Sequence, residues 1–143
     1  MLPVLMLLGF ATWTLMLLIA TVGVYRWSRI FRGQARISQF RADGAQEQDW
    51  YQRATRAHAN CIENLPVFGA LVFALYVTGV SSPVVDPLCA IVLAARIVQS
   101  LVHVCFVQTD RVVSVRFSFF TVQAISFLVL IGVIFFSLYV GRS

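Results

Sequence analysis

Lysine is absent from this 143-residue sequence, whose eleven basic residues are all arginine, and only six residues are acidic. The sequence also contains no phosphate-binding loop, dinucleotide fingerprint or zinc-ligand spacing, so it does not indicate the nucleotide-dependent and zinc-dependent classes that those motifs mark. Its three cysteines are odd in number and have no paired spacing, which predicts small core side chains rather than disulfides or metal ligands. We therefore expect no metal and no nucleic-acid partner.

Apolar residues make up 59% of the chain, and the mean hydropathy is +0.83. Soluble domains usually contain only about 45 to 50% apolar residues. Four apolar runs each reach the roughly 20 residues that a helix needs to cross hydrocarbon, and the helices that contain them are expected at about 3–30, 49–80, 83–108 and 112–140. The sequence therefore predicts an all-α integral membrane protein, a single domain over residues 1–143 built as a bundle of four transmembrane helices. The first run has no basic head or cleavage site, so it is expected to be a retained span rather than a signal peptide.

Arginine is distributed unevenly among the connections between these runs. Seven of the eleven arginines lie between Tyr25 and Cys61, and Arg111 and Arg116 lie at the third connection, whereas the second connection, TGVSSPVVDP, has none. The positive-inside rule then predicts a multi-pass protein with the two arginine-bearing connections in the cytoplasm and both termini on the non-cytoplasmic side. The arginines of the first connection are open to two interpretations, a basic face near anionic headgroups or a set of guanidinium groups that binds carboxylates.

The stretch RATRAHANCIENLP, residues 53–66, carries polar groups into the second apolar run. Because nothing from Asp49 to Leu65 breaks a helix, we expect the second helix to begin near Asp49, before the membrane. At about 100° per residue, one arc of about 80° then contains four polar side chains, Arg53, Arg56, Asn60 and Glu63. His58 lies almost opposite and should face a different neighbour.

Polar stripes are also expected on the third and fourth helices. Arg96, Gln99 and His103 share one face, and Arg96 lies near the bilayer centre, where an unpaired arginine costs roughly 2.5 to 3.5 kcal/mol on insertion scales. Arg116 opens the fourth helix, and Gln123 lies on the same face, at about 340° relative to it. At a rise of about 1.5 Å per residue, the polar groups of the second, third and fourth helices are expected at similar depths in the membrane. Arg96 and Glu63 are then about 7 Å apart along the helix axis.

Glu63 is the only acidic side chain of the apolar runs at that depth, so we expect it to pair with Arg96, directly or through a bound group. A purely structural ion pair is one interpretation. The surplus of arginines favours another, in which an anionic ligand that also carries a cationic group fills the site. A zwitterionic peptide with two carboxylates fits that description.

The stretch RATRAHANCIENLPVF resembles the signature of the MAPEG superfamily, the membrane-associated proteins of eicosanoid and glutathione metabolism, in which R-A-[HQ]-x-N-x-x-E-x-x-P-x-F opens the second helix. The resemblance extends to the four spans, the arginine-rich first connection, the buried arginine of the third helix and the arginine that opens the fourth. It implies a homotrimer of four-helix subunits that binds glutathione between neighbouring subunits near the cytoplasmic face.

The resemblance and the polar stripes together predict the site. Arg116 resembles the arginine placed against the glutathione sulfur and is the predicted catalytic residue. The predicted glutathione-binding residues are Arg36, Arg56, Asn60, Glu63, Arg96, Gln99 and His103. Tyrosines that the synthases of the family place on the third and fourth helices are not evident, and His103, Phe119 and Phe120 stand there instead.

The predicted function is that of a glutathione-dependent membrane enzyme, transferase-like or peroxidase-like, acting on a lipophilic substrate. A guanidinium group beside a thiol, whose pKa is ordinarily near 8.5, favours the nucleophilic thiolate. The substrate would arrive from the bilayer past Phe117, Phe119 and Phe120, although these side chains are also typical of a surface that simply faces lipid. Two other hypotheses are a non-catalytic trimeric scaffold that binds anionic membrane lipid and a small transporter with Glu63 and His103 as a proton relay.

Overall fold

The computed structural model describes residues 1–34, 36 and 49–140. Its elements follow one another as α1 (Leu2–Leu17), the π-helical turn η1 (Leu18–Gly23), α2 (Val24–Phe31), α3 (Asp49–Thr78), α4 (Val85–Cys105) and α5 (Asp110–Val140). Since α1, η1 and α2 are continuous, the described chain forms four helices that are long and apolar enough to cross a membrane. The predicted all-α fold with four spans is confirmed, and each observed helix end lies within three residues of the expected one.

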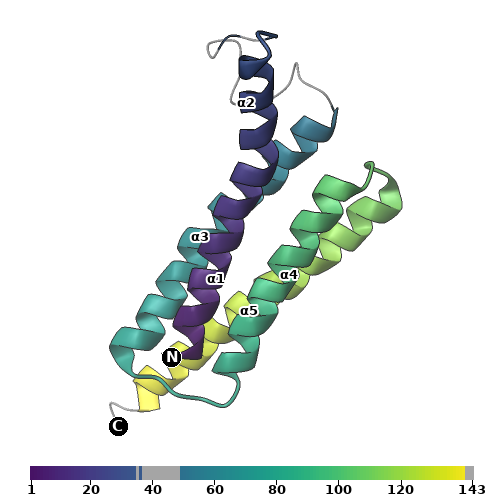
Figure 1. Cartoon of the computed structure of the whole chain (residues 1–143). Coiled ribbons are helices and arrows are strands. Elements are labelled where there is room, and N and C mark those ends of the chain that lie inside the picture. Colours follow the sequence, from purple (N-terminus) through teal and green to yellow (C-terminus); the bar gives the residue numbers. More distant parts are fainter. Residues whose placement is uncertain (35, 37–48, 141–143) are drawn as a thin grey trace.

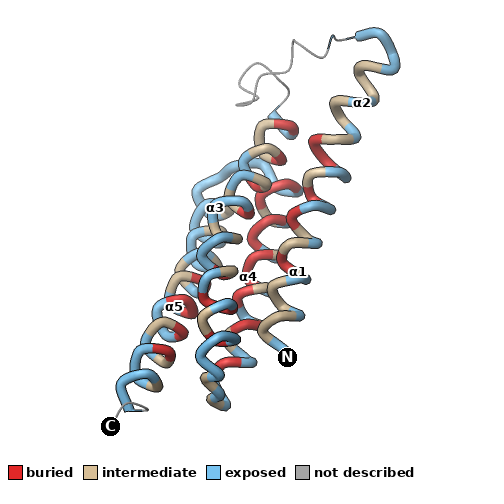
Figure 2. Tube along the Cα trace, turned by 90° about the vertical axis from the view of Figure 1, so that its left-hand side faces the viewer, coloured by how far each residue is buried: buried red, intermediate tan, exposed pale blue. Residues whose placement is uncertain are grey.

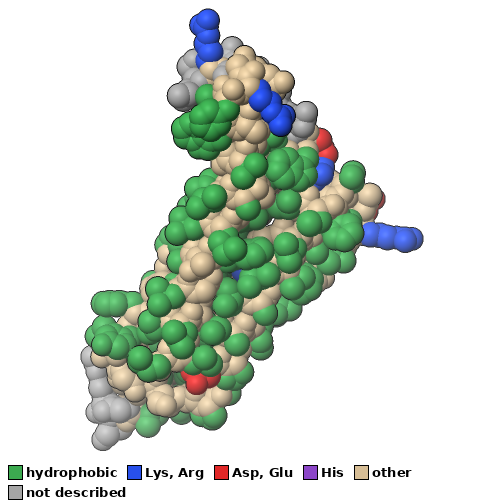
Figure 3. All heavy atoms as spheres, viewed as in Figure 1, with side chains coloured by type: hydrophobic (Ala, Val, Ile, Leu, Met, Phe, Trp, Pro, Cys, Tyr) green, Lys and Arg blue, Asp and Glu red, His purple; other side chains and the backbone are tan. Residues whose placement is uncertain are grey.

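The four spans lie side by side along one direction (Figure 1). One end of the bundle holds the end of α2, the start of α3 and the connection from α4 to α5, and we refer to it as the arginine end. Figure 3 shows arginine side chains gathered mainly there, whereas apolar side chains cover most of the remaining visible surface. The opposite end holds the start of α1, the end of α5 and the turn between α3 and α4.

Carboxylates and one glycine mark several helix ends. Asp49, Asp86 and Asp110 lie in the first turns of α3, α4 and α5, where a negative charge is favoured by the exposed N–H groups of the helix. After α3 ends at Thr78, Gly79 takes a φ of +65°, a left-handed conformation that other residues rarely adopt. The observed start of α3 at Asp49 places the whole RATRAHANCIENLP stretch on one helix.

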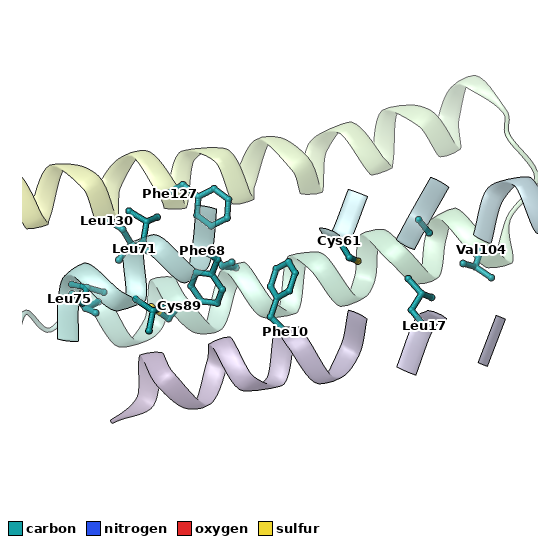
Figure 4. Packing of buried hydrophobic residues seen from close by; sticks show 14 of the residues in the cluster. Phe10, Leu17, Cys61, Phe68, Leu71, Leu75, Cys89, Val104, Phe127 and Leu130 are labelled. Carbon is teal, nitrogen blue, oxygen red and sulfur yellow. The ribbon is translucent and has the colours of Figure 1, made fainter. Parts of the chain in front are cut away.

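Aromatic rings join the spans at the centre of the bundle. The ring of Phe68 on α3 lies 5.8 Å from that of Phe10 on α1 and 6.1 Å from that of Phe127 on α5, measured between centroids. Figure 4 shows these rings among the other buried apolar side chains. Gly9 lets α1 approach α4, because a Cβ atom there would lie 3.0 Å from Cδ2 of Leu93.

The outer sides of the helices are apolar and exposed. Figure 2 shows that buried positions follow the sides on which the helices face one another, while the outward sides are mostly exposed. Such a surface is stable only against lipid or a protein partner. A charged side chain on the outward side of a spanning helix would be unfavourable against lipid, so its position there has to be explained.

Candidate functional site

One face of α4 carries buried polar groups toward the arginine end. Arg96, Gln99, Ser100 and His103 are only 1%, 6%, 2% and 2% exposed. Their spacing of three and four residues places them on one side of the helix. This side meets the other spans, since Gln99 bonds to α5 and Ser100 contacts α3. The polar stripe predicted for the third span thus lies inside the bundle.

Arg96 is held by neutral groups from two other spans. Its Nη2 donates to Oε1 of Gln123 on α5, and its guanidinium carbon lies 5.7 Å from the centroid of the Phe10 ring on α1. The hydroxyl of Ser100 donates to the backbone carbonyl of Arg96 at 2.8 Å and lies 3.4 Å from the sulfur of Cys61 on α3. All four spans therefore contribute to the surroundings of Arg96.

The direct ion pair predicted between Glu63 and Arg96 is not formed among the described residues, where Arg96 bonds to Gln123 instead. Glu63 is exposed on the outward side of α3, because that helix buries the face containing Ala57 and Cys61 and Glu63 lies about 200° around the helix from Cys61. The interpretation that Glu63 and Arg96 form a purely structural ion pair within one subunit is therefore wrong for the described residues. Glu63 does lie within electrostatic range of Arg96, and pairing through a bound group stays a prediction.

A pocket of about 220 Å³ opens where α3, α4 and α5 meet. Its lining residues are Asn60, Gln99, Val113, Arg116, Phe117 and Phe120. The side-chain amide of Gln99 donates to the backbone carbonyl of Arg116 at 3.2 Å, which ties α4 to the first turns of α5. Three lining residues are polar and three are apolar, so the pocket combines a hydrogen-bonding part with a hydrophobic part.

Several buried polar atoms near this pocket have no hydrogen-bond partner within the part of the chain that the structure describes. At the pocket these atoms are Oε1 of Gln99 and Nε of Arg116, and nearby they are Nδ1 of His103, Nε of Arg53, Nε of Arg96 and Nε2 of Gln123. Leaving such a group unpaired costs roughly 1 to 3 kcal/mol. Their concentration here indicates that something else, a ligand or a second protein surface, completes the site.

Positive charge converges on the same region. The charges of Arg53, Arg56 and Arg116 all act on the ring of His103, and that of Arg56 acts on Arg116. Arg53 forms an ion pair with Asp49, four residues before it on α3. The remaining guanidinium groups of this region are those of Arg56, Arg96 and Arg116, and among the described residues the carboxylate that acts on Arg96 is that of Glu63. Counted together, these three arginines and one glutamate carry a net charge of +2.

The structure brings some of the predicted site residues together and separates others. Asn60, Gln99 and Arg116 line the pocket, and Arg96 and His103 continue the buried face of α4. Arg56 and Glu63 lie on the outward side of α3, while Arg36 lies beyond α2, is exposed and is not among the residues that line the pocket. His58 faces the backbone of Thr14 on α1, a different neighbour from the other polar groups of its helix.

Gln123, Ser100 and Cys61 were not among the predicted site residues, although Gln123 was expected on the Arg116 face of the fourth helix. Helical spacing carried the signal for two of them, because Gln123 follows Arg116 by seven residues and Ser100 follows Arg96 by four. Cys61 had no such signal. It contacts Ser100 only because α3 and α4 pack closely at that level.

A larger pocket, of about 310 Å³, lies at the opposite end of the bundle between the starts of α1 and α4 and the end of α3. Its lining contains Asp86 but no arginine or histidine. It therefore lacks the guanidinium groups to which the predicted thiol activation was assigned. Within the described residues, no group of three or more histidine, cysteine or acidic side chains is placed to hold a metal ion.

The sequence matches the family model described as the MAPEG family over residues 4–136. The match includes most or all of each span and every predicted site residue. Among curated proteins and among solved structures, no similar protein is found.

Proposed function

Because this chain belongs to the MAPEG family, we propose that it is a glutathione-dependent membrane enzyme, of transferase or peroxidase type, which activates the glutathione thiol for attack on a lipophilic substrate. The family includes glutathione-dependent transferases and peroxidases along with other members. The observation that carries the proposal is the pocket between α3, α4 and α5, whose lining combines Asn60, Gln99 and Arg116 with Val113, Phe117 and Phe120.

The polar groups suit glutathione in kind and in charge. Glutathione has two carboxylates and one ammonium group, so with its thiol ionised it carries two negative charges, equal to the excess of two positive charges from Arg56, Arg96 and Arg116 over Glu63. Guanidinium groups bind carboxylates well, and a carboxylate such as that of Glu63 binds an ammonium group. The unpartnered donors and acceptor around Arg116 and Gln99 supply further hydrogen bonds to a peptide backbone.

Arg116 is the residue best placed to act on the thiol. It lines the pocket, and its Nε is buried without a partner among the described side chains and backbone. Bound glutathione supplies a thiol whose sulfur becomes the nucleophile once its proton has passed to water. A guanidinium group at that sulfur favours the thiolate, and each tenfold rise in the thiolate to thiol ratio requires about 1.4 kcal/mol.

The apolar part of the pocket suits the second substrate. Phe117 and Phe120 line it, their ring centroids lie 6.4 Å apart, and both side chains are exposed on the surface of α5. In a membrane this surface meets lipid, so an apolar electrophile dissolved in the bilayer has a short path to the polar part. Conjugation then forms a carbon–sulfur bond as the leaving group takes its electron pair. Reduction of a hydroperoxide breaks the oxygen–oxygen bond as the thiolate sulfur takes one oxygen to become a sulfenic acid and the other oxygen leaves as an alcohol, and a second glutathione then converts the sulfenic acid to the disulfide and water.

Completing the site requires a second subunit. Arg56 and Glu63 are exposed on the outward side of a membrane-spanning helix, where lipid contact is costly for a charged group. A neighbouring subunit covers both, in the homotrimer that the family resemblance implies, and glutathione binds at that contact. The positive-inside rule places the arginine end in the cytoplasm and both termini on the other side.

The proposal is tested with purified protein in detergent, glutathione and a chlorodinitrobenzene as acceptor. We expect turnover that depends on glutathione and falls by at least about tenfold in Arg116→Ala. Arg111→Ala is the matched control, because Arg111 is an exposed arginine of the same helix end that does not line the pocket. Wild-type protein that is folded and trimeric but neither turns over the acceptor nor binds glutathione contradicts the proposal.

A second candidate function is binding of anionic lipid by a non-catalytic scaffold. The observation that favours it is an aromatic and cationic cluster between α2 and α3, where Nε of Arg26 donates to the hydroxyl of Tyr51 at 2.5 Å and the rings of Tyr25 and Tyr51 lie 4.5 Å apart. Arginine and tyrosine near a membrane surface are typical of headgroup contact, and because Tyr51 is fully buried the half-buried Tyr25 and Arg26 would make that contact. Saturable binding of anionic vesicles without glutathione binding would favour this function over the enzyme.

A further inference from the structure

Arg96 has the largest fully buried side chain in the described chain. It lies near the middle of α4 (Val85–Cys105), at a depth where an isolated charge is costly. Arginine does not lose its proton in proteins, so the charge persists and must be stabilised by its surroundings. If the groups that contact Arg96 are anionic, they cancel its charge. If they are neutral, the charge can act on a bound anion.

The groups that contact Arg96 are neutral. Oε1 of Gln123 accepts from Nη2, and the face of the Phe10 ring lies 5.7 Å from the guanidinium carbon. The orientation of the Gln123 amide follows from this contact, because a guanidinium group only donates and therefore requires the oxygen. The carboxylate of Glu63 acts on Arg96 from a distance and lies on the outward side of α3.

We propose that Gln123 is a positioning residue that holds the Arg96 guanidinium through a neutral acceptor and so leaves its positive charge available to an anion bound at the arginine end. A carboxylate at position 123 would hold the same group equally well but would cancel its charge. A glutamine holds the guanidinium group without cancelling its charge. This inference rests on the proposed function, which names glutathione as the anion.

The position of Gln123 supports this role. It is 1% exposed, so its amide has almost no contact with solvent, and it lies on the same face of α5 as Arg116 two turns away. Its Nε2 has no partner in the described part of the chain. Gln123 thus connects the deep arginine to the helix that carries the predicted catalytic residue, without itself lining the pocket.

The test compares Gln123→Glu, which adds a charge with little change in size, with Gln123→Leu, which removes the acceptor. Thermal unfolding is measured in detergent without ligand, and glutathione affinity is measured by calorimetric titration. We expect Gln123→Glu to keep or raise the unfolding temperature while lowering the affinity by about tenfold or more. Gln123→Leu should unfold at a lower temperature than wild type, because Arg96 loses its acceptor.

Two controls separate the role of Gln123 from general effects of charge. Gln108→Glu makes the same substitution at an exposed residue of the arginine end and should change neither measurement. In an Arg96→Gln background, Gln123→Glu should cause little further loss of affinity, because a carboxylate at this buried position without a guanidinium partner takes up a proton and adds no charge.

The possible outcomes are distinct. Wild-type affinity in Gln123→Glu, or a loss of stability as large as in Gln123→Leu, overturns the inference and leaves the proposed function intact. If wild-type protein binds no glutathione, the proposed function fails, and the unfolding temperatures still decide how Gln123 holds Arg96. An unfolding temperature of Gln123→Glu at or above that of wild type, together with a lower one for Gln123→Leu, supports the role of residue 123 as the acceptor that holds Arg96. Equal unfolding temperatures for wild type and both variants overturn that role.

Discussion

Gln99 and Arg116 are joined by a hydrogen bond from the side-chain amide of Gln99 on α4 to the backbone carbonyl of Arg116 on α5, with a length of 3.2 Å. The bond fixes the backbone from which the Arg116 side chain extends into the pocket. It also uses only the donor end of the amide, so Oε1 of Gln99 is left without a partner among the described residues. One side chain thus positions the predicted catalytic residue and presents an acceptor to a ligand.

Gln99→Leu tests this double role. The variant loses a buried hydrogen bond, for which we expect a loss of about 1 kcal/mol in stability and an unfolding temperature lower by a few degrees. Glutathione affinity and turnover should fall together, since both the acceptor and the placement of Arg116 are lost. Gln108→Leu, at an exposed residue of the same end, is the control and should match wild type in all three measurements. Unchanged affinity in Gln99→Leu would show that the amide serves only the packing of α4 on α5.

Replacement of Arg116 should change the ionisation of bound glutathione. With wild-type protein at neutral pH we expect the ultraviolet absorbance of a thiolate when glutathione binds. Arg116→Ala should lose most of this absorbance, because a loss of about 1.4 kcal/mol of stabilisation lowers the thiolate to thiol ratio tenfold. Arg116→Lys keeps a charge but not the guanidinium fork, so it should give an intermediate signal.

The control for this measurement is Arg111→Ala, which removes an exposed arginine from the first turn of the same helix. It should leave the thiolate absorbance at the wild-type level. A full thiolate signal in Arg116→Ala would assign the activation of the thiol to another cation. Arg56 is the candidate, because its charge acts on Arg116.

Much of the fold was predictable because a membrane restricts the choices. Runs of about 20 apolar residues permit little except spanning helices. Helix periodicity likewise placed Arg96, Gln99 and His103 on one face, and the structure buries that face. The start of α3 at Asp49 followed from the absence of helix breakers and from a carboxylate that suits a helix N-terminus.

The pairing of Glu63 with Arg96 could not be decided from depth alone. Axial spacing placed the two residues at compatible levels, but it does not define how each helix is rotated about its own axis. That rotation depends on which face packs, and on α3 the small residues Ala57 and Cys61 pack inward, so Glu63 turns outward. Arg96 then bonds to Gln123, and the ion pair between Asp49 and Arg53 likewise depended on rotamers that the sequence does not define.

Binding of glutathione and assembly of the trimer should be linked. Arg56 and Glu63 are exposed on the outward side of α3, whereas Gln99 and Arg116 line the pocket. The proposed ligand would contact both sets where a neighbouring subunit covers α3. We expect native mass spectrometry in mild detergent to show a trimer that glutathione stabilises against dissociation. Glu63→Gln should weaken both the ligand affinity and this stabilisation by about tenfold. A monomer that binds glutathione with wild-type affinity would contradict the linkage.

The orientation of the bundle in the membrane decides which glutathione pool the site meets. Cys105 is exposed at the arginine end of α4, while Cys61 and Cys89 are buried, so wild-type protein offers one accessible thiol. A membrane-impermeant maleimide should label Cys105 in inverted vesicles but not in intact cells, and Cys105→Ser should abolish the labelling. Ser81→Cys in the Cys105→Ser background places a thiol at an exposed residue of the opposite end and should show the reverse pattern. Labelling of Cys105 in intact cells would turn the arginine end away from the cytoplasm, and the pocket would then be cut off from the reduced glutathione that the cytoplasm maintains.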